Sequence, residues 1–459
     1  MPTSGGLGST GVAGRQHRGP VIAAIFLTIW VIHSLSPVTT STDSAWTIHV
    51  AASILREGNI DLDEYRSLMD LRLDYRLREI RGRVYNYYPV ATSTLVTPIV
   101  WLANRFYALA HPSDFFAYLS RHAPDDRTAR LEKLAAAGFV ALAAVFMYLA
   151  ARVRLSAVAS TGIALMFAFA TSMWSTASRA LWQHGPSALF LAIALYLLVA
   201  AADKPAAIFC TGLVLGGAYL IRPTNSLSVA FIGLYILLNR RRAFWLFATG
   251  ALVVLVPFAL QNWLTYGNVL PPYAYQLFER LGTLRSIGEA LAGTLISPNR
   301  GLFVFTPLFA FSIYGAYLVM TRRAVSLGAM ELYLMAIIVG HWITTSLFED
   351  WGGAWSIGPR YFVDIIPYLI YFLIPLFEMR VLLRPALTYA FLASVLLSTL
   401  IQLHCAVSVY PFQWNGKPQA LVEAPARKWD WGDMQFLRGL CPGEALEGRA
   451  PACWLNRGS

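Results

Sequence analysis

An acidic side chain, Asp43, follows the first long apolar run of the sequence, in the segment Thr39-Thr40-Ser41-Thr42-Asp43-Ser44-Ala45-Trp46. A carboxylate held at a membrane surface can take the proton from an attacking hydroxyl group, which is general-base chemistry. The position is also typical of a helix N-cap, because a helical pattern runs from Trp46 to Leu55 and stops at Gly58. The sequence therefore predicts either a base or a cap at Asp43.

Three arginines stand beside proline or glycine at predicted membrane boundaries. They are Arg222 before Pro223, Arg300 before Gly301, and Arg360 after Pro359. Guanidinium groups bind phosphate in a bidentate geometry, so we expect these side chains to hold the phosphate of a donor substrate. Snorkelling to lipid headgroups is the alternative for any one of them.

The segment from residue 349 to residue 361 combines acids, aromatic rings and glycines. Glu349 and Asp350 precede Trp351 and Trp355 in it. Sugar rings stack on aromatic faces, and carboxylates accept the hydrogens of sugar hydroxyls, so this segment is predicted to bind a sugar. An interfacial aromatic belt is the alternative for the two tryptophans, but it explains the adjacent acids less well.

A single histidine, His184, stands in the segment Leu181-Trp182-Gln183-His184-Gly185-Pro186. Its imidazole could line the same cavity or shuttle a proton. A lone histidine at a helix entrance is more often a cap or an interface residue. Both interpretations remain open for His184.

The composition indicates that lipid is the solvent of this chain. Of 459 residues, 57% are hydrophobic and 13% are charged, which is too apolar for a soluble protein to cover its own surface. The net charge is +11, but the basic residues form short clusters between apolar runs. This distribution favours loops that face anionic lipid over a nucleic-acid partner.

The four cysteines form no pattern of metal-ligand spacing, so no structural metal is predicted, and the divalent-metal dependence of any activity stays open. Cys405, Cys441 and Cys453 fall in a polar C-terminal tail, where an oxidising compartment permits a disulfide. We expect Cys441 to pair with Cys453.

Eleven apolar runs are long enough to be membrane helices, given that a bilayer core requires roughly 20 residues. The first follows a basic leader without a clear cleavage site, so we interpret it as an uncleaved span. The runs are Pro20–Ser36, Leu134–Ala151, Ser156–Trp174, Pro186–Ala202, Ala206–Ile221, Ser226–Leu238, Phe244–Leu260, Leu302–Met320, Leu332–Leu347, Phe362–Phe377 and Pro385–Leu403.

The run Val90–Ala103 decides the direction of every later helix. It is about 14 residues long and contains Pro98, which is typical of an interfacial helix. If it does not span, the arginine and lysine clusters between helices all lie on the side of the basic N-terminus, as the positive-inside rule requires. The sequence thus predicts a cytoplasmic N-terminus and an extracytoplasmic C-terminus.

This topology places Asp43 and all the candidate segments on the extracytoplasmic face. The first external loop is 38–133, and its part from Asp61 to Tyr88 mixes charges with leucines at helical spacing. We expect that part to be an amphipathic helix on the membrane. The domains predicted are a cytoplasmic tail, 1–19, a membrane domain, 20–404, and an extracytoplasmic tail, 405–459.

The order of these motifs resembles the type C superfamily of polyprenyl-phosphate-sugar-dependent glycosyltransferases, particularly bacterial members related to protein O-mannosyltransferases and aminoarabinose transferases. The resemblance extends to about Cys405. It is carried by Asp43, Gly58-Asn59-Ile60-Asp61-Leu62, Tyr87-Tyr88-Pro89, Trp182-Gln183-His184-Gly185-Pro186, Arg222-Pro223-Thr224-Asn225, Ser297-Pro298-Asn299-Arg300-Gly301 and Trp351-Gly352-Gly353-Ala354-Trp355-Ser356-Ile357-Gly358-Pro359-Arg360-Tyr361.

The resemblance implies an all-α fold with juxtamembrane helices in the first loop, the second being Val90–Ala103, and an inverting displacement with Asp43 as the base. It adds Tyr88 and Tyr361 to the sugar or acceptor site. Many relatives have an Asp-Glu pair where this chain has Asp43-Ser44, and Asp350 is our candidate for a second catalytic acid.

The predicted function is transfer of a sugar from a polyprenyl-phosphate carrier to an acceptor hydroxyl, in a bacterial inner membrane. The expected partners are that donor, membrane lipids, and a lipid or glycan acceptor, with protein as a further option. Two alternatives share the same ligand chemistry: a flippase for lipid-linked sugars, and a ligase that joins glycans.

Overall fold

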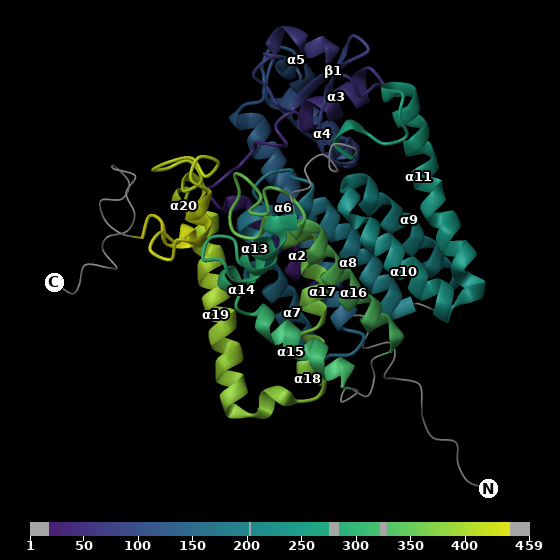
Figure 1. Cartoon of the computed structure of the whole chain (residues 1–459). Helices are drawn as coiled ribbons and strands as arrows, with labels where there is room; N and C mark the ends of the chain where they lie inside the picture. Colours follow the sequence, from purple (N-terminus) through teal and green to yellow (C-terminus); the bar gives the residue numbers. More distant parts are fainter. Residues whose placement is uncertain (1–17, 202, 275–283, 322–327, 441–459) are drawn as a thin grey trace, which may run out of the picture.

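The computed structural model describes residues 18–201, 203–274, 284–321 and 328–440. Apolar helices stand side by side in it as a bundle (Figure 1). The predicted all-α, polytopic membrane class is confirmed, while the number of crossings stays a prediction. The described helices that are long and apolar enough to cross a membrane are Asp126–Ala151, His184–Ala201, Arg241–Tyr266, Arg360–Glu378 and Pro385–Val407.

Each predicted run corresponds to helical structure, although two runs are broken near prolines. Leu302–Met320 is interrupted at Pro307, and Phe362–Phe377 begins as a 3-10 helix and restarts at Ile374, directly before Pro375, because proline lacks the N–H that the interior of an α-helix needs. The bundle comprises α2 (Arg18–Leu35), α6 (Asp126–Ala151), α7 (Ala157–Phe169), η2 (Met173–Ala177), α8 (His184–Ala201), α9 (Pro205–Ile221), η3 (Pro223–Asn225), α10 (Ser226–Asn239), η4 (Arg241–Ala243), α11 (Phe244–Tyr266), α14 (Leu302–Phe305), α15 (Phe309–Met320), α16 (Ala329–Ser346), η5 (Arg360–Ile365), α17 (Ile366–Tyr371), α18 (Ile374–Glu378), η6 (Val381–Leu383) and α19 (Pro385–Val407).

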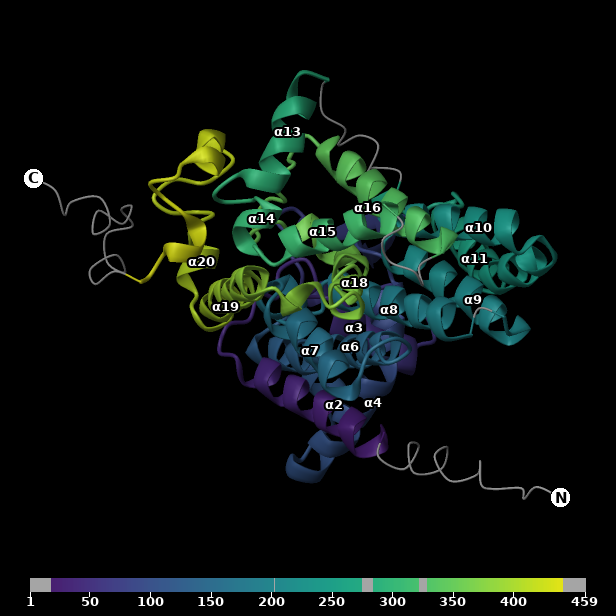
Figure 2. The same ribbon diagram turned by 90° about the horizontal axis from the view of Figure 1, so that it is seen from below.

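Glycines let two helices at one edge of the bundle approach closely. Figure 2 shows α9, α10 and α11 grouped at this edge, with α19 at the opposite edge. A Cβ atom at Gly212 of α9 would lie 2.0 Å from the carbonyl oxygen of Phe247, and one at Gly250 of α11 would lie 2.1 Å from that of Phe209. Small residues at such crossings are typical of helix packing in membranes.

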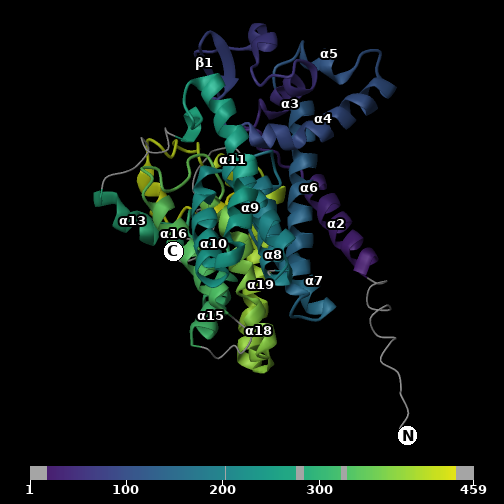
Figure 3. The same cartoon turned by 90° about the vertical axis from the view of Figure 1, so that its right-hand side faces the viewer.

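The first loop folds into a cap over one end of the bundle, which we call the loop face (Figure 3). Its elements are α3 (Thr47–Arg56), η1 (Asp63–Leu68), β1 (Leu77–Ile80), β2 (Arg83–Asn86), α4 (Ala91–Ala110) and α5 (Phe115–Leu119). In agreement with the expected juxtamembrane helix, α4 packs on α3 and runs across the end of the bundle.

The prediction of an amphipathic helix between Asp61 and Tyr88 is wrong. This part contains η1 and a hairpin in which β1 pairs antiparallel with β2. The hairpin turns at Arg81 and Gly82, which both have positive φ, as a two-residue turn of this kind requires. The Arg-Gly pair between two short strands was the missed signal.

The C-terminal part packs beside α13 (Leu284–Ile296) and α14 on the loop face. Its elements are α20 (Tyr410–Gln413), η7 (Pro425–Trp429) and η8 (Gln435–Leu437). Cys405, expected in a polar tail, lies buried inside α19 as a free thiol, because the helix runs on to Val407. The expected Cys441–Cys453 disulfide lies outside the described residues.

Candidate active site

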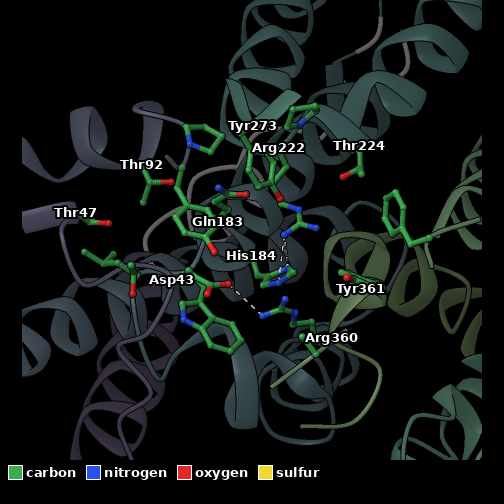
Figure 4. Close-up of a pocket in the computed structure, with 18 of the residues that line it drawn as sticks. Asp43, Thr47, Thr92, Gln183, His184, Arg222, Thr224, Tyr273, Arg360 and Tyr361 are labelled. Atoms are coloured by element: carbon green, nitrogen blue, oxygen red, sulfur yellow. Dashed lines mark hydrogen bonds and ion pairs between the residues drawn. The ribbon is translucent and has the colours of Figure 1, made fainter. Parts of the chain in front are cut away.

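A cavity of about 300 Å³ at the loop face collects most of the predicted site residues (Figure 4). Its walls come from the turn before α3, the start of α4, the segments before α8 and α10, and the segment between α16 and η5. The predicted residues that line it are Asp43, Tyr88, His184, Arg222, Glu349, Asp350, Arg360 and Tyr361.

Asp43 points into this cavity and does not cap α3. The residue at the N-cap position is Trp46, and no side chain caps the helix there, so the alternative interpretation of Asp43 is wrong. Oδ1 of Asp43 accepts a hydrogen bond from the Tyr75 hydroxyl at 2.9 Å, and Oδ2 lies 3.3 Å from Nη1 of Arg360. Both carboxylate oxygens therefore have a donor.

Arg360 stands at the start of η5 with its guanidinium over the ring of Trp182, 5.0 Å from the ring centre. Its Nε is buried and lacks a hydrogen-bond partner among the described residues. A buried guanidinium with an unused N–H donor can bind an anionic oxygen by a charge-assisted hydrogen bond. Arg360 thus couples the carboxylate of Asp43 to a place where an anion can bind.

Arg222, the second arginine of the cavity, is held by a buried acid. Its Nε lies 2.7 Å from Oδ2 of Asp364, whose side chain is fully buried in η5. His184 packs against both, with Nδ1 3.4 Å from Oδ1 of Asp364 and both ring nitrogens 3.2 Å from Nη1 of Arg222. Asp364 therefore fixes the direction of Arg222 and the orientation of His184.

Two tyrosines bring hydroxyl groups to Asp43. Burial raises the pKa of Tyr75, and the negative charge of Asp43 raises it further. Burial and the same charge also raise the pKa of Tyr88. Both hydroxyls therefore stay protonated at neutral pH and can donate. The ring of Tyr273 is tilted by 45° against that of Tyr88, with ring centres 5.7 Å apart, and it also lines the cavity.

Asp350 and Glu349 line the cavity from the segment between α16 and η5. Oδ2 of Asp350 accepts the Ala354 amide at 2.6 Å, and Oδ1 accepts Nζ of Lys428 at 3.1 Å. Burial alone would raise the pKa of Asp350, but the Lys428 ammonium, the charge of Arg300 and the Ala354 amide together hold this pKa below its usual value. Asp350 is therefore ionised and tied to its own loop, while Glu349 stands at the exposed rim.

Three predicted site residues lie away from the cavity. Trp351 is buried against Trp429 and Lys428, and the ring of Trp355 packs on Phe412. Both tryptophans thus hold the C-terminal part rather than face the cavity.

Arg300 is also committed elsewhere. Its Nη1 donates to Oε1 of Gln435 at 2.6 Å, and its Nη2 donates to Oδ1 of Asn415 at 2.6 Å and to the carbonyl of Ala354 at 3.2 Å. These contacts use the guanidinium N–H groups that the sequence assigned to a phosphate. The sequence could not show that residues 415 and 435 return to this loop.

The chain is similar in fold to an archaeal oligosaccharyltransferase. The apo form of the enzyme from Archaeoglobus fulgidus gives a TM-score of 0.47 at 11% identity, covering 90% of this chain and 59% of that one. Its complex with Zn and sulfate gives 0.49 at 15% identity, with 90% and 57% covered. The present chain therefore spans less than two thirds of that enzyme. No family model and no curated protein matches the sequence, and TM-scores below 0.5 do not establish a shared activity.

Sequence reasoning missed several residues of the site: Tyr75, Trp182, Gln183, Tyr273 and Asp364. Asp364 did leave a signal, since an acid inside the predicted run Phe362–Phe377 is costly in a membrane and usually functional. Tyr75 was hidden by the wrong helix assignment. In the part of the chain that the structure describes, no group of three or more His, Cys, Asp or Glu side chains is gathered as a metal site would require.

Replacing Arg300 with alanine is expected to destabilise the protein without weakening donor binding. The change leaves the buried Oδ1 of Asn415 without a donor, at about 1–3 kcal/mol. It also removes one of the two donors to Oε1 of Gln435, which still accepts from the Gly358 amide. Thermal unfolding in nanodiscs should show a lower midpoint, while titration with a lipid phosphate should give an unchanged Kd. Loss of lipid-phosphate affinity with unchanged stability would restore the phosphate role of Arg300.

Proposed function

We propose that this protein is a membrane glycosyltransferase that moves a sugar from a polyprenyl-phosphate carrier to an acceptor hydroxyl. The observation that carries the proposal is the contact between the Asp43 carboxylate and the Arg360 guanidinium in one cavity. A base for the acceptor and a cation for the departing phosphate are the two groups that this reaction needs.

In this proposal the donor phosphate binds between Arg360 and Arg222. Arg360 offers its unpartnered Nε, and Arg222 is aimed by Asp364. Fixed cations that face a developing phosphate charge cost no reorganisation when the bond breaks. The sugar would then lie against Tyr88, Tyr273 and Trp182, whose rings line the cavity.

The reaction we propose is a single displacement. The acceptor oxygen attacks the anomeric carbon while its proton passes to Asp43. The bond from that carbon to the phosphate oxygen breaks, and the electron pair leaves with the polyprenyl phosphate, next to Arg360. One attack from the side opposite the leaving group inverts the anomeric configuration. Asp350 supports the loop that carries Arg360, and Glu349 faces the sugar or acceptor from the rim.

The remaining features of the proposal follow the predicted topology. The loop face is extracytoplasmic and the N-terminus cytoplasmic, because the positive-inside rule assigns the basic clusters between helices to the opposite side. The membrane is that of a bacterial cell, as the resemblance to bacterial glycosyltransferases implies. A lipid or a glycan supplies the acceptor hydroxyl, with protein as a further option.

The proposal is tested by incubating the purified protein in nanodiscs with a panel of polyprenyl-phosphate sugars and envelope lipid and glycan as acceptors. Transfer of a sugar with an inverted linkage is the expected result. A product with retained configuration would exclude the single displacement. Movement of the lipid-linked sugar across the bilayer without release of polyprenyl phosphate would identify a flippase instead.

Replacing Arg360 with alanine is expected to weaken donor binding about 10–100-fold, since a hydrogen bond to a charged group contributes about 1.5–3 kcal/mol. Titration of the protein with polyprenyl phosphate measures this directly. The matched control is Arg127→Ala, which removes an arginine bonded to Tyr107 on the same face but outside the cavity lining. Equal weakening by both variants would mean that the loss reflects overall charge.

A further inference from the structure

A buried carboxylate, Glu132, lies behind the cavity in the second turn of α6. Its residue is fully buried, and it is not among the residues that line the cavity. It therefore cannot touch a substrate. The free-energy cost of burying a carboxylate has to be offset by hydrogen bonds. The hydrogen-bond partners of Glu132 therefore show which segments it fixes.

The partners of Glu132 come from two of the segments that line the cavity, the turn before α3 and the segment before α8. Oε1 accepts the hydroxyl of Ser41 at 2.7 Å, and Oε2 accepts that of Ser44 at 2.5 Å. Oε2 also lies 3.4 Å from the backbone nitrogen of Leu181. Ser41 and Ser44 flank Asp43 on its two sides, and Leu181 directly precedes Trp182, on which Arg360 stacks.

Other contacts fix the same turn from outside. Lys133, the next residue of α6, donates from Nζ to the carbonyl of Val38 at 2.9 Å. Nη1 of Arg76 donates to the carbonyl of Thr42 at 3.1 Å. The segment from residue 38 to residue 44 has few backbone hydrogen bonds of its own, so these side chains determine where Asp43 points.

We propose that Glu132 is a positioning residue: it clamps Ser41, Ser44 and Leu181 so that Asp43 and Arg360 face each other across the donor site. The catalytic consequence of this clamp rests on the proposed function, but the contacts that form the clamp do not depend on it. A misplacement of about 1 Å can cost about 100-fold in rate. A base carried by an irregular turn depends on such support.

The clamp is tested first by hydrogen–deuterium exchange of the protein in nanodiscs, with Glu132→Gln. The amide keeps the size of the side chain but replaces one acceptor oxygen with a donor, so one serine hydroxyl loses its acceptor. Exchange is expected to rise in peptides covering residues 38–46 and 180–184. The double variant Ser41→Ala/Ser44→Ala, which leaves α6 intact, should show the same rise in residues 38–46.

The matched control is Glu331→Gln in α16. Glu331 is also buried and accepts a hydrogen bond, from the Tyr371 hydroxyl at 3.0 Å, but it lies in the first turn of α16, at the end of that helix away from the segment that lines the cavity. Its replacement should leave exchange in residues 38–46 unchanged. Unchanged exchange in the Glu132→Gln protein, or an equal rise in both variants, would overturn the clamp.

Kinetics then test the catalytic consequence. Glu132→Gln should lower kcat about 100-fold, by the misplacement argument above. In an Asp43→Asn background Glu132→Gln should lower kcat no further, because the base that Glu132 positions is already gone. Independent losses in the double variant would overturn the positioning role. If wild-type protein transfers no sugar while the exchange result stands, the proposed function fails and the clamp remains.

Discussion

Asp43→Asn is expected to lower kcat for sugar transfer about 10²- to 10⁴-fold, the range that general-base catalysis contributes. The amide cannot take the proton from the acceptor hydroxyl, whereas it still accepts a hydrogen bond from Tyr75. Arg360 loses its ion-pair partner and stays free for phosphate, so donor affinity should be retained. Turnover in nanodiscs and titration with polyprenyl phosphate measure the two quantities separately.

The control for this variant is Asp70→Asn. Asp70 lies on the same loop and accepts the amide hydrogens of Arg72 and Leu73, which asparagine can also accept. The Asp70→Asn protein should turn over at the rate of the wild type. An Asp43→Asn protein with wild-type turnover would remove Asp43 from the mechanism, and a parallel loss of donor binding would show that Asp43 organises the phosphate site instead.

Asp364→Ala is expected to cost about 3–5 kcal/mol of the free energy of unfolding, because it leaves the buried guanidinium of Arg222 without its counter-charge. Unfolding in mixed micelles of increasing denaturing detergent measures this loss. Donor affinity should fall as well, since Arg222 is no longer aimed into the cavity.

Two further variants show whether charge explains that loss. Asp203→Ala breaks an exposed pair with Arg240, at 3.9 Å, and should change stability by at most about 1 kcal/mol. The double variant Asp364→Ala/Arg222→Met should recover part of the stability, because no unpaired charge remains. A double variant less stable than Asp364→Ala would contradict this explanation.

The sequence predicts the helical, membrane-embedded class because apolar runs of bilayer length have few other solutions. It also predicts that Asp43, Arg222 and Arg360 share a face, since the positive-inside rule orients each run independently of tertiary structure. These arguments need only hydropathy and charge. The cavity shows that the three residues meet.

Contacts between distant segments could not be predicted in the same way. Arg300 has the same local signature as Arg360, a boundary arginine beside proline and glycine, yet it binds Gln435 and Asn415. Arg300 differs from Arg360 only because residues 415 and 435, which follow α19, fold back against it. Asp364 and Glu132 lie in or near apolar runs, where their partners come from segments far away in sequence.

The contacts of Arg300 have a consequence for biogenesis. Gln435 and Asn415 accept from Arg300, and both also donate to the carbonyl of Ser356, in the loop that ends at Arg360. Both residues follow α19 and are synthesised after all of the described helices of the bundle. Until they leave the ribosome and dock, the loop that presents Arg360 lacks its support. The proposed donor site of a nascent chain is therefore unfinished during membrane insertion, and under our proposal the chain does not bind a lipid-linked sugar before folding is complete.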